Sequence, residues 1–255
     1  MSRAAACAVL ALMLSACASN SAQPVTPGRD AARANVQLGV AYMQQGQLAL
    51  AKEKLERAAK QDPRSAEVHS ALAYLNERLD RPDAADAEYR LALRLSPNNS
   101  EVGNNYAVFL CRNGKVDTAL KQFDLAARDR LYTTPWAALT NAGVCLRSAD
   151  RGGEAVRLLE QAIALRPQYT PAVFELADLQ LELGSPGVAG LVVDRFLALG
   201  LTAPDVLLLG VRAALARDER PAAQTLARRL RREFANSEQA KALTALLGDG
   251  GSSRE

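Results

Sequence analysis

The sequence predicts an all-α fold: a right-handed superhelical solenoid of about six helix pairs, closed by a C-terminal capping helix. Ala, Leu and Arg are abundant in the 255-residue chain and aromatic residues make up only 5% of it, a composition that favours helices over sheets. Small, large and proline residues recur with a 34-residue period, which is the length of one helix–turn–helix unit in a repeat protein. Glycines and prolines also stand where such helices would end and begin.

The first sixteen residues have the features of a bacterial lipoprotein signal peptide. Arg3 gives a positive start, and an uncharged apolar run of eleven residues follows at 4–14, too short to span a bilayer, which needs about 20. The run leads into Ser15, Ala16 and Cys17, so we expect cleavage after residue 16 and lipidation of Cys17. An ordinary signal peptide that happens to contain a cysteine is the alternative. Ala18, rather than the Asp that favours inner-membrane retention, indicates the outer membrane.

The segments that flank the repeats are expected to form a flexible tether at one end and a capping helix with a disordered tail at the other. Residues 17–30, which carry the lipidated Cys17, are rich in Ser, Gln, Pro, Thr and Gly without apolar periodicity, and they predict a flexible tether. Residues 236–255 are expected to form a capping helix, at 237–247, and a disordered tail. The repeat array itself occupies residues 31–235.

Six repeats fit this array, and they follow the tetratricopeptide (TPR) pattern. The pattern places Leu-Gly and Tyr in the first helix of each unit, helix A, and Ala, Phe, Ala and Pro in the second, helix B. Four copies in register argue against the alternative of a generic bundle rich in Ala and Leu. Repeat one matches with Leu38, Gly39, Tyr42, Ala51, Leu55, Ala58 and Pro63. The repeats are 32–65, 66–99, 100–135, 136–169, 170–202 and 203–235.

Residue size and turn chemistry explain the spacing. Gly39 and Ala51 let helices A and B approach closely, and Leu38, Tyr42 and Leu55 are expected to fill the space between successive pairs. We expect A helices to end at glycines that tolerate the left-handed conformation, namely Gly46, Gly114 and Gly184. Prolines suit the first turn of the B helices, at Pro82, Pro186 and Pro221.

Repeat three is two residues longer than its neighbours, and repeats five and six are degenerate. Leu131 stands where repeat three should close with a proline, and Tyr132-Thr133-Thr134-Pro135 follows. We therefore expect a longer loop between repeats three and four.

The sequence predicts a protein without enzymatic activity. It contains no catalytic or phosphate-binding motif, and its single histidine, His69, is expected to be a partly exposed packing residue in helix A of repeat two. No cofactor, metal or small-molecule substrate is expected. A net charge of +3 is too small to indicate nucleic-acid binding.

Cys111 and Cys145 are the cysteines left after Cys7 is removed with the signal peptide and Cys17 is lipidated. They lie in the A helices of repeats three and four, which pack side by side, and the periplasm permits disulfides. A bridge requires Cα atoms within about 7 Å and would stabilise the fold by about 3.5–4 kcal/mol. Two buried thiols in the wrong register are the alternative, and a metal site lacks further ligands at suitable spacing.

The concave face is the candidate binding site, because TPR arrays usually bind peptides through side chains that project from their A helices. An apolar strip in repeat one predicts a hydrophobic groove for a partner segment; residues 24–30 packing over that strip are the alternative. The outward positions in repeats one to three are Arg33, Val36, Val40, Met43, Glu67, Ser70, Tyr74, Glu77, Glu101, Asn104 and Val108. The residues expected to bind the partner are Arg33, Val36, Val40, Met43, Ser70, Tyr74 and Asn104.

Two segments in the middle of the chain carry a resemblance to a known family. One runs from Asn104 to Gly114 and reads NNYAVFLCRNG; the other combines Tyr132-Thr133-Thr134-Pro135 with NAGVC at 141–145. With the lipidation signal and six TPR units, they resemble the PilF/PilW family of type IV pilus biogenesis and stability lipoproteins. The resemblance covers nearly the whole mature chain and is strongest in repeats one to four. Ala107 departs from it, because the family has Gly there.

The resemblance implies a pilotin, a non-enzymatic factor that binds the type IV pilus secretin, helps it reach the outer membrane and supports its assembly into a ring. It also implies that the early repeats hold the contact and that Cys111 and Cys145 match the family's paired cysteines. The expected partners are the secretin and, through the lipid, the periplasmic face of the outer membrane. A TPR lipoprotein that binds and regulates a periplasmic cell-wall enzyme is the alternative.

Overall fold

The computed structural model describes residues 27–247, and this part of the chain consists of thirteen helices joined by short loops. The predicted signal peptide at 1–16, the lipidation of Cys17, the tether up to residue 26 and the tail at 248–255 lie outside the described residues.

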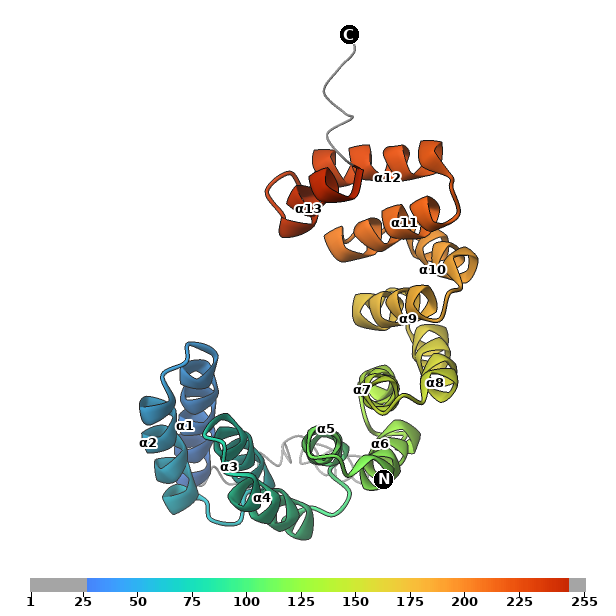
Figure 1. Ribbon diagram of the computed structural model, residues 1–255. Helices are drawn as coiled ribbons and strands as arrows, with labels where there is room; N and C mark the ends of the chain where they lie inside the picture. The colour runs from blue at the N-terminus through green and yellow to red at the C-terminus, as the bar shows by residue number, and fades with distance from the viewer. Residues whose placement is uncertain (1–26, 248–255) are drawn as a thin grey trace, which may run out of the picture.

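Six helix pairs stack into an open arc, with the A helices on its inner side and the B helices on its outer side (Figure 1). The A helices are α1 (Pro27–Gln44), α3 (Ala66–Arg78), α5 (Ser100–Arg112), α7 (Pro135–Ser148), α9 (Thr170–Glu182) and α11 (Pro204–Ala216). The B helices are α2 (Leu48–Gln61), α4 (Pro82–Leu95), α6 (Val116–Arg128), α8 (Gly152–Leu165), α10 (Pro186–Ala198) and α12 (Arg220–Glu233). Each A helix contacts its own B helix and its neighbouring A helices along the array, which is the predicted TPR solenoid.

Small residues bring the paired helices together as expected. A Cβ at Gly39 would lie 2.7 Å from the Leu55 side chain, and a Cβ at Gly143 would lie equally close to Leu159 in repeat four. Leu55 is fully buried. The prediction that Leu38 fills the interface was wrong, since this side chain is 47% exposed. One residue step rotates a helical side chain by about 100°, so the neighbour of the inward-facing Gly39 points away from α2.

Each A helix is followed by a residue in the left-handed backbone conformation, and glycine and aspartate alternate at this position from one repeat to the next. Gly46, Gly114 and Gly184 have φ of +73°, +73° and +70°, which confirms the prediction for the odd-numbered repeats. Aspartates occupy the equivalent position in the even-numbered repeats: Asp80, Asp150 and Asp218, with φ of +54°, +57° and +63°. Asp adopts this conformation more readily than most residues with a Cβ, but at a cost that glycine avoids.

Helix α1 begins at Pro27, so the last four residues of the expected tether are helical. Proline fits the first turn of a helix, and Asp30 in that turn interacts favourably with the helix dipole. Further along α1, Asn35 Nδ2 donates a hydrogen bond to Gln61 Oε1 at the end of α2 at 2.8 Å. Residues 28–30 are exposed and continue α1, and they do not fold over the apolar strip.

The C-terminal end of the array is closed by α13 (Glu238–Leu247), as predicted. Ser237 caps this helix, its hydroxyl accepting the Ala240 amide at 3.1 Å. Leu243 of α13 is fully buried in a cluster that includes Leu207 of α11 and Leu230 of α12. The last repeat therefore has an apolar face covered by the chain itself.

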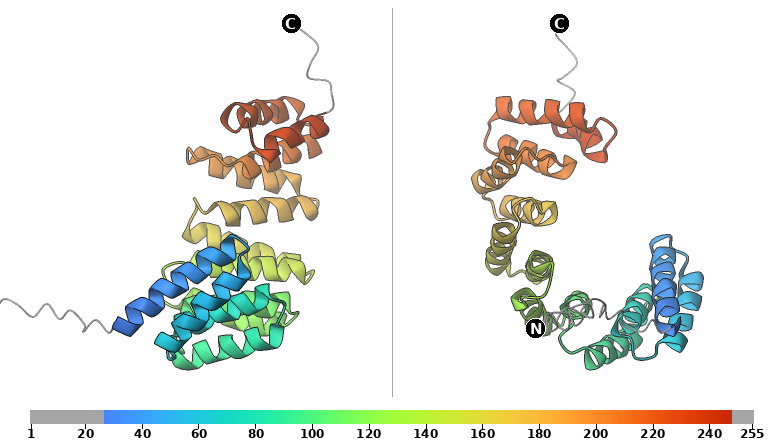
Figure 2. Two further views of the ribbon diagram at one scale, coloured as in Figure 1. Left: turned by 90° about the vertical axis from the view of Figure 1, so that its left-hand side faces the viewer. Right: turned by 180° about the vertical axis from the view of Figure 1, so that it is seen from behind.

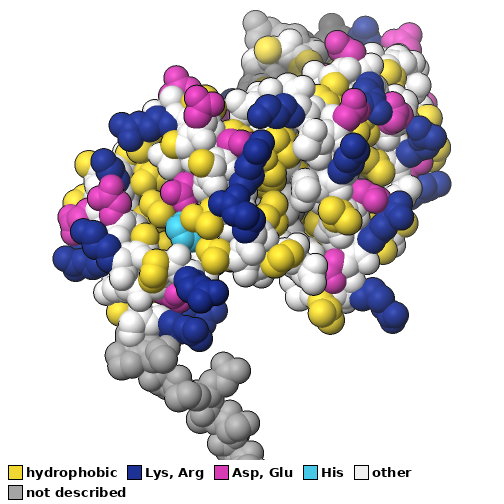
Figure 3. Space-filling model, turned by 90° about the horizontal axis from the view of Figure 1, so that it is seen from below, with side chains coloured by type: hydrophobic (Ala, Val, Ile, Leu, Met, Phe, Trp, Pro, Cys, Tyr) yellow, Lys and Arg dark blue, Asp and Glu magenta, His cyan; other side chains and the backbone are white. Residues whose placement is uncertain are grey.

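The two arms of the arc leave its inner side open. Seen from behind, the arm formed by α1–α4 and the arm formed by α9–α13 stand apart (Figure 2). Seen from below, basic and acidic side chains are interspersed with hydrophobic ones (Figure 3). No helix within residues 27–247 is both long and apolar enough to cross a membrane.

Candidate partner-binding groove

A groove of about 580 Å³ crosses the A helices of repeats one to three on the inner side of the arc. Helices α1, α3 and α5 supply most of its lining, and Asn141 of α7 closes one end. Its apolar lining includes Val36 and Val40 of α1, Tyr74 of α3 and Val108 of α5. Tyr74 is the most exposed of these at 38%, whereas Val36 is only 5% exposed. We call this feature the α1–α3–α5 groove.

The structure brings six of the seven predicted partner-binding residues together. The residues that line the α1–α3–α5 groove are Arg33, Val36, Val40, Ser70, Tyr74 and Asn104. The prediction that Met43 projects outward was wrong, because its side chain is fully buried in a cluster with Val68 and Leu75. Met43 lies on the same helical stripe as Val36, but α3 covers this end of α1. That these residues bind a partner stays a prediction.

Acidic side chains in the groove fall into two groups. Glu77 is engaged: it accepts the Tyr89 hydroxyl at 2.7 Å and lies 3.4 Å from the Arg112 guanidinium. Burial raises the pKa of Tyr89 well above its usual range, so its hydroxyl remains a donor. Glu67 and Glu101 are exposed, and within residues 27–247 neither has an ion-pair partner. They are available to a ligand.

Asparagine amides line the middle of the groove. Asn104, only 8% exposed, accepts a hydrogen bond from Asn141 Nδ2 at 3.0 Å. This bond leaves the Asn104 amide nitrogen and the Asn141 amide oxygen without a partner among the described residues. Asn105 beside them is exposed. The groove therefore offers both donors and acceptors, the combination that an extended peptide backbone requires.

A second cavity of about 700 Å³ adjoins the groove at the start of α5. Asp129 and residues 131–134 of the longer loop predicted between repeats three and four form its far wall, and we call this cavity the loop shelf. Asp129 holds the loop, accepting the Ser100 hydroxyl at 2.5 Å and the Leu131 amide at 2.9 Å. These bonds lower the pKa of Asp129. The groove and the loop shelf share the lining residues Asn99, Glu101, Asn104 and Asn105.

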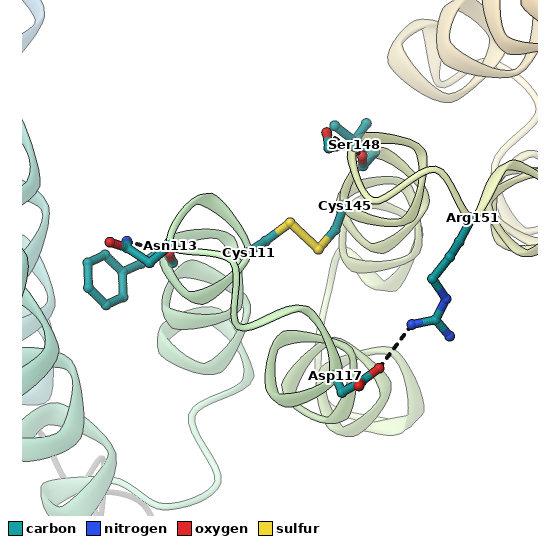
Figure 4. The surroundings of a disulfide bond; sticks show 8 residues. Cys111, Asn113, Asp117, Cys145, Ser148 and Arg151 are labelled. Carbon is teal, nitrogen blue, oxygen red and sulfur yellow. Dashed lines mark hydrogen bonds and ion pairs between the residues drawn. A yellow bond between two sulfur atoms is a disulfide. The ribbon is translucent and has the colours of Figure 1, made fainter.

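A disulfide joins repeats three and four. Cys111 of α5 and Cys145 of α7 have Cα atoms 5.8 Å apart, and their sulfurs are bonded across the two helices (Figure 4). Close to it, Arg151 at the start of α8 donates to Asp117 of α6 at 2.9 Å. The boundary between the groove-bearing repeats and the later repeats is therefore fastened on both the inner and the outer layer.

The later repeats carry ion pairs on their inner face instead of an open groove. Arg147 of α7 reaches Glu175 at 2.9 Å, Asp178 at 2.6 Å and Glu182 on α9. Arg212 of α11 bonds the other oxygen of Asp178 at 2.9 Å. These carboxylates raise the pKa of Arg147. We call this set the Arg147 network; it ties three successive A helices together.

Sequence reasoning missed this network, although the spacing of charges could have revealed it. Opposite charges one repeat length apart face each other on neighbouring helices of a solenoid. Four pairs separated by 34 or 35 residues are bonded in this way: Glu77–Arg112, Asp117–Arg151, Arg147–Glu182 and Asp178–Arg212.

His69 is buried, which corrects the expectation of partial exposure. It is 8% exposed, and its Nδ1 lies 2.6 Å from Glu88 Oε2 while its Nε2 lies 3.0 Å from the Pro63 carbonyl oxygen. Two acceptors favour the doubly protonated ring. The Glu88 bond is the main cause that raises the pKa of His69; burial opposes it and the Pro63 bond reinforces it. Across residues 27–247 no group of three or more His, Cys, Asp and Glu side chains is arranged to hold a metal.

Known proteins match both the repeats and most of the chain. A tetratricopeptide repeat family model matches residues 36–100. The type IV pilus assembly protein PilF of Pseudomonas aeruginosa is 32% identical over 239 residues, which cover 92% of this chain and 95% of PilF. The chain belongs to the PilF/PilW family of type IV pilus biogenesis proteins.

Solved structures agree with this family assignment. The crystal structure of PilW, a widely conserved type IV pilus biogenesis factor, matches with a TM-score of 0.66 and 30% identity over 83% of this chain and 97% of PilW. The structure of Pseudomonas aeruginosa PilF matches with a TM-score of 0.66 and 29% identity over 87% of this chain and all of the other. An uncharacterised protein of Haemophilus influenzae is 34% identical over 143 residues, 56% of this chain and 79% of its own length.

Proposed function

We propose that this PilF/PilW family protein is a pilotin, a lipid-anchored factor on the periplasmic face of the outer membrane that binds the type IV pilus secretin and supports its assembly. The observation that carries the binding role is the α1–α3–α5 groove, which combines an exposed Tyr74 with unpaired carboxylates and amides. Membership of the family supports the link to type IV pilus biogenesis.

The groove and the anchor would act together. The repeats hold an apolar segment of a secretin subunit, which keeps that segment from aggregating in the periplasm. The lipid on Cys17 directs the complex to the membrane. A Cys17→Ser protein should therefore fold and bind the secretin but fail to deliver it to the outer membrane.

Deletion followed by membrane fractionation tests the function. Without this protein, heat-stable secretin multimers should be lost from the outer membrane and return when the wild-type chain is supplied. Undiminished multimers in the deletion strain would end the pilotin proposal. Altered peptidoglycan synthesis with normal secretin would instead support the regulator of a cell-wall enzyme.

A substitution within α1 tests the groove. Val40→Asp places a charge in the apolar lining and should weaken secretin binding by at least about tenfold. Leu38→Asp is a matched control, because Leu38 is exposed on the same helix and does not line the groove. Far-UV circular dichroism should be unchanged for both. Equal binding by the two variants would remove the groove from the contact.

A further inference from the structure

The α1–α3–α5 groove does not end at its apolar strip. It continues past the asparagines of α5 onto the loop shelf, since the two cavities share four lining residues. A partner that occupied only the apolar strip would leave this continuation filled with water. The shape therefore suits a segment that runs across three A helices and reaches the 129–134 loop.

The charge along this path changes from mixed to acidic. Near α1 the lining includes Arg33, and in the middle Arg112 is engaged by Glu77. On the loop shelf the charged lining residues are Glu101 and Asp129, and no Lys or Arg of the described chain joins them. An anionic segment would be repelled there, whereas a cationic side chain would meet the exposed Glu101, which has no ion-pair partner among the described residues, and would lie near Asp129.

We propose that the bound segment is an extended peptide whose apolar side chains lie against Val40 and Tyr74 and whose adjoining Lys or Arg side chains lie over the loop shelf near Glu101. The amides of Asn104, Asn105 and Asn141 hold its backbone. The proposal rests on the pilotin function above, because it takes the groove as the secretin contact, and it adds the chemistry of the segment.

Three synthetic peptides test the proposal by fluorescence polarisation with the purified mature protein. Each begins with Leu-Val-Phe-Val and continues with Gly-Lys-Ser-Lys, Gly-Gln-Ser-Gln or Gly-Glu-Ser-Glu. The lysine peptide should bind most tightly and the glutamate peptide most weakly, with the difference shrinking as salt is added. Equal binding of the three, or preference for the glutamate peptide, would overturn the proposal.

Two variants separate charge from backbone recognition. Glu101→Gln should lower the affinity of the lysine peptide about threefold and leave the glutamine peptide unaffected. Asn105→Ala should weaken all three peptides by a similar factor, because a backbone contact does not depend on the side chains. Glu160→Gln, an exposed position on the outer helix α8, is the matched control and should change nothing. An effect of Glu101→Gln on all peptides alike would contradict the assignment.

Secretin capture distinguishes this proposal from the function it rests on. If wild type and Glu101→Gln capture the secretin equally while Val40→Asp does not, the basic segment is wrong and the pilotin function stands. If Val40→Asp also captures it normally, the groove fails as the secretin contact. Reduced capture by both variants supports the proposal.

Discussion

The inner faces of the first three repeats and the last three differ although both are built from the same TPR unit. In repeats one to three, Tyr74, Glu67 and Glu101 are exposed and uncommitted. In repeats four to six, the arginines and carboxylates of the Arg147 network are paired with one another between neighbouring helices. A binding surface needs polar groups that are free to contact a ligand, whereas a surface that stabilises the stack of helices has its polar groups paired within the protein. One half is thus suited to recognition and the other to holding the arc's shape.

The largest expected effect is at the boundary between the halves. Replacing Cys111 and Cys145 together by Ser should lower the free energy of unfolding by about 3.5–4 kcal/mol. The groove repeats should then unfold before the braced repeats, because solenoid stability depends on nearest-neighbour interfaces. Urea unfolding followed by circular dichroism would measure the loss in free energy of unfolding. Reduction of the wild type should reproduce the loss and leave the variant unaltered; equal stability of the oxidised wild type and the variant would contradict it.

A pair of charge variants sharpens the comparison. Arg147→Ala removes the cation shared by Glu175, Asp178 and the more exposed Glu182, leaves Asp178 paired with Arg212 alone, and should cost about 1–3 kcal/mol. Glu67→Gln removes an unpaired exposed charge and should stay within about 0.5 kcal/mol of wild type. Thermal and urea unfolding of both would compare them. A stability loss for Glu67→Gln as large as that for Arg147→Ala would mean that the two faces are not used differently.

His69 should make the groove-bearing half sensitive to pH. Its pKa is raised in the folded state, chiefly by Glu88, so its stabilisation is fully present below the unfolded value of about 6.5 and is lost as pH rises through the folded pKa. The stability difference between wild type and His69→Asn should therefore shrink from pH 5.5 to pH 8.5 in urea unfolding. A difference that grows with pH would contradict the assigned bonds.

A small gain in stability is expected from substitutions at the helix ends. Asp80→Gly in the first half and Asp218→Gly in the second remove the backbone strain of a left-handed residue that carries a Cβ. Each should stabilise the chain by about 0.5–1 kcal/mol. Thermal unfolding of the single variants measures this gain. Gly114→Ala, at the same turn of repeat three, should lose a similar amount. Destabilisation by both glycine variants would show that the aspartates contribute contacts beyond the turn.

Local patterns in the sequence predicted most of the fold. Gly39 and Leu55 recur as Gly143 and Leu159 because every helix pair solves the same packing problem, and the loop after repeat three follows from its two added residues. Met43 was misplaced because coverage of the end of α1 depends on how α3 crosses it. The Arg147 network was missed because its contacts join different repeats, so that only comparison at one-repeat spacing reveals them.

Hydrogen–deuterium exchange of this protein with and without the type IV pilus secretin tests the central claim most directly. We expect slower exchange in α1, α3 and the start of α5 when the secretin is bound, with α9 and α11 unchanged. Protection confined to α9–α12, with α1 and α3 unchanged, would contradict the assignment of recognition to the first three repeats.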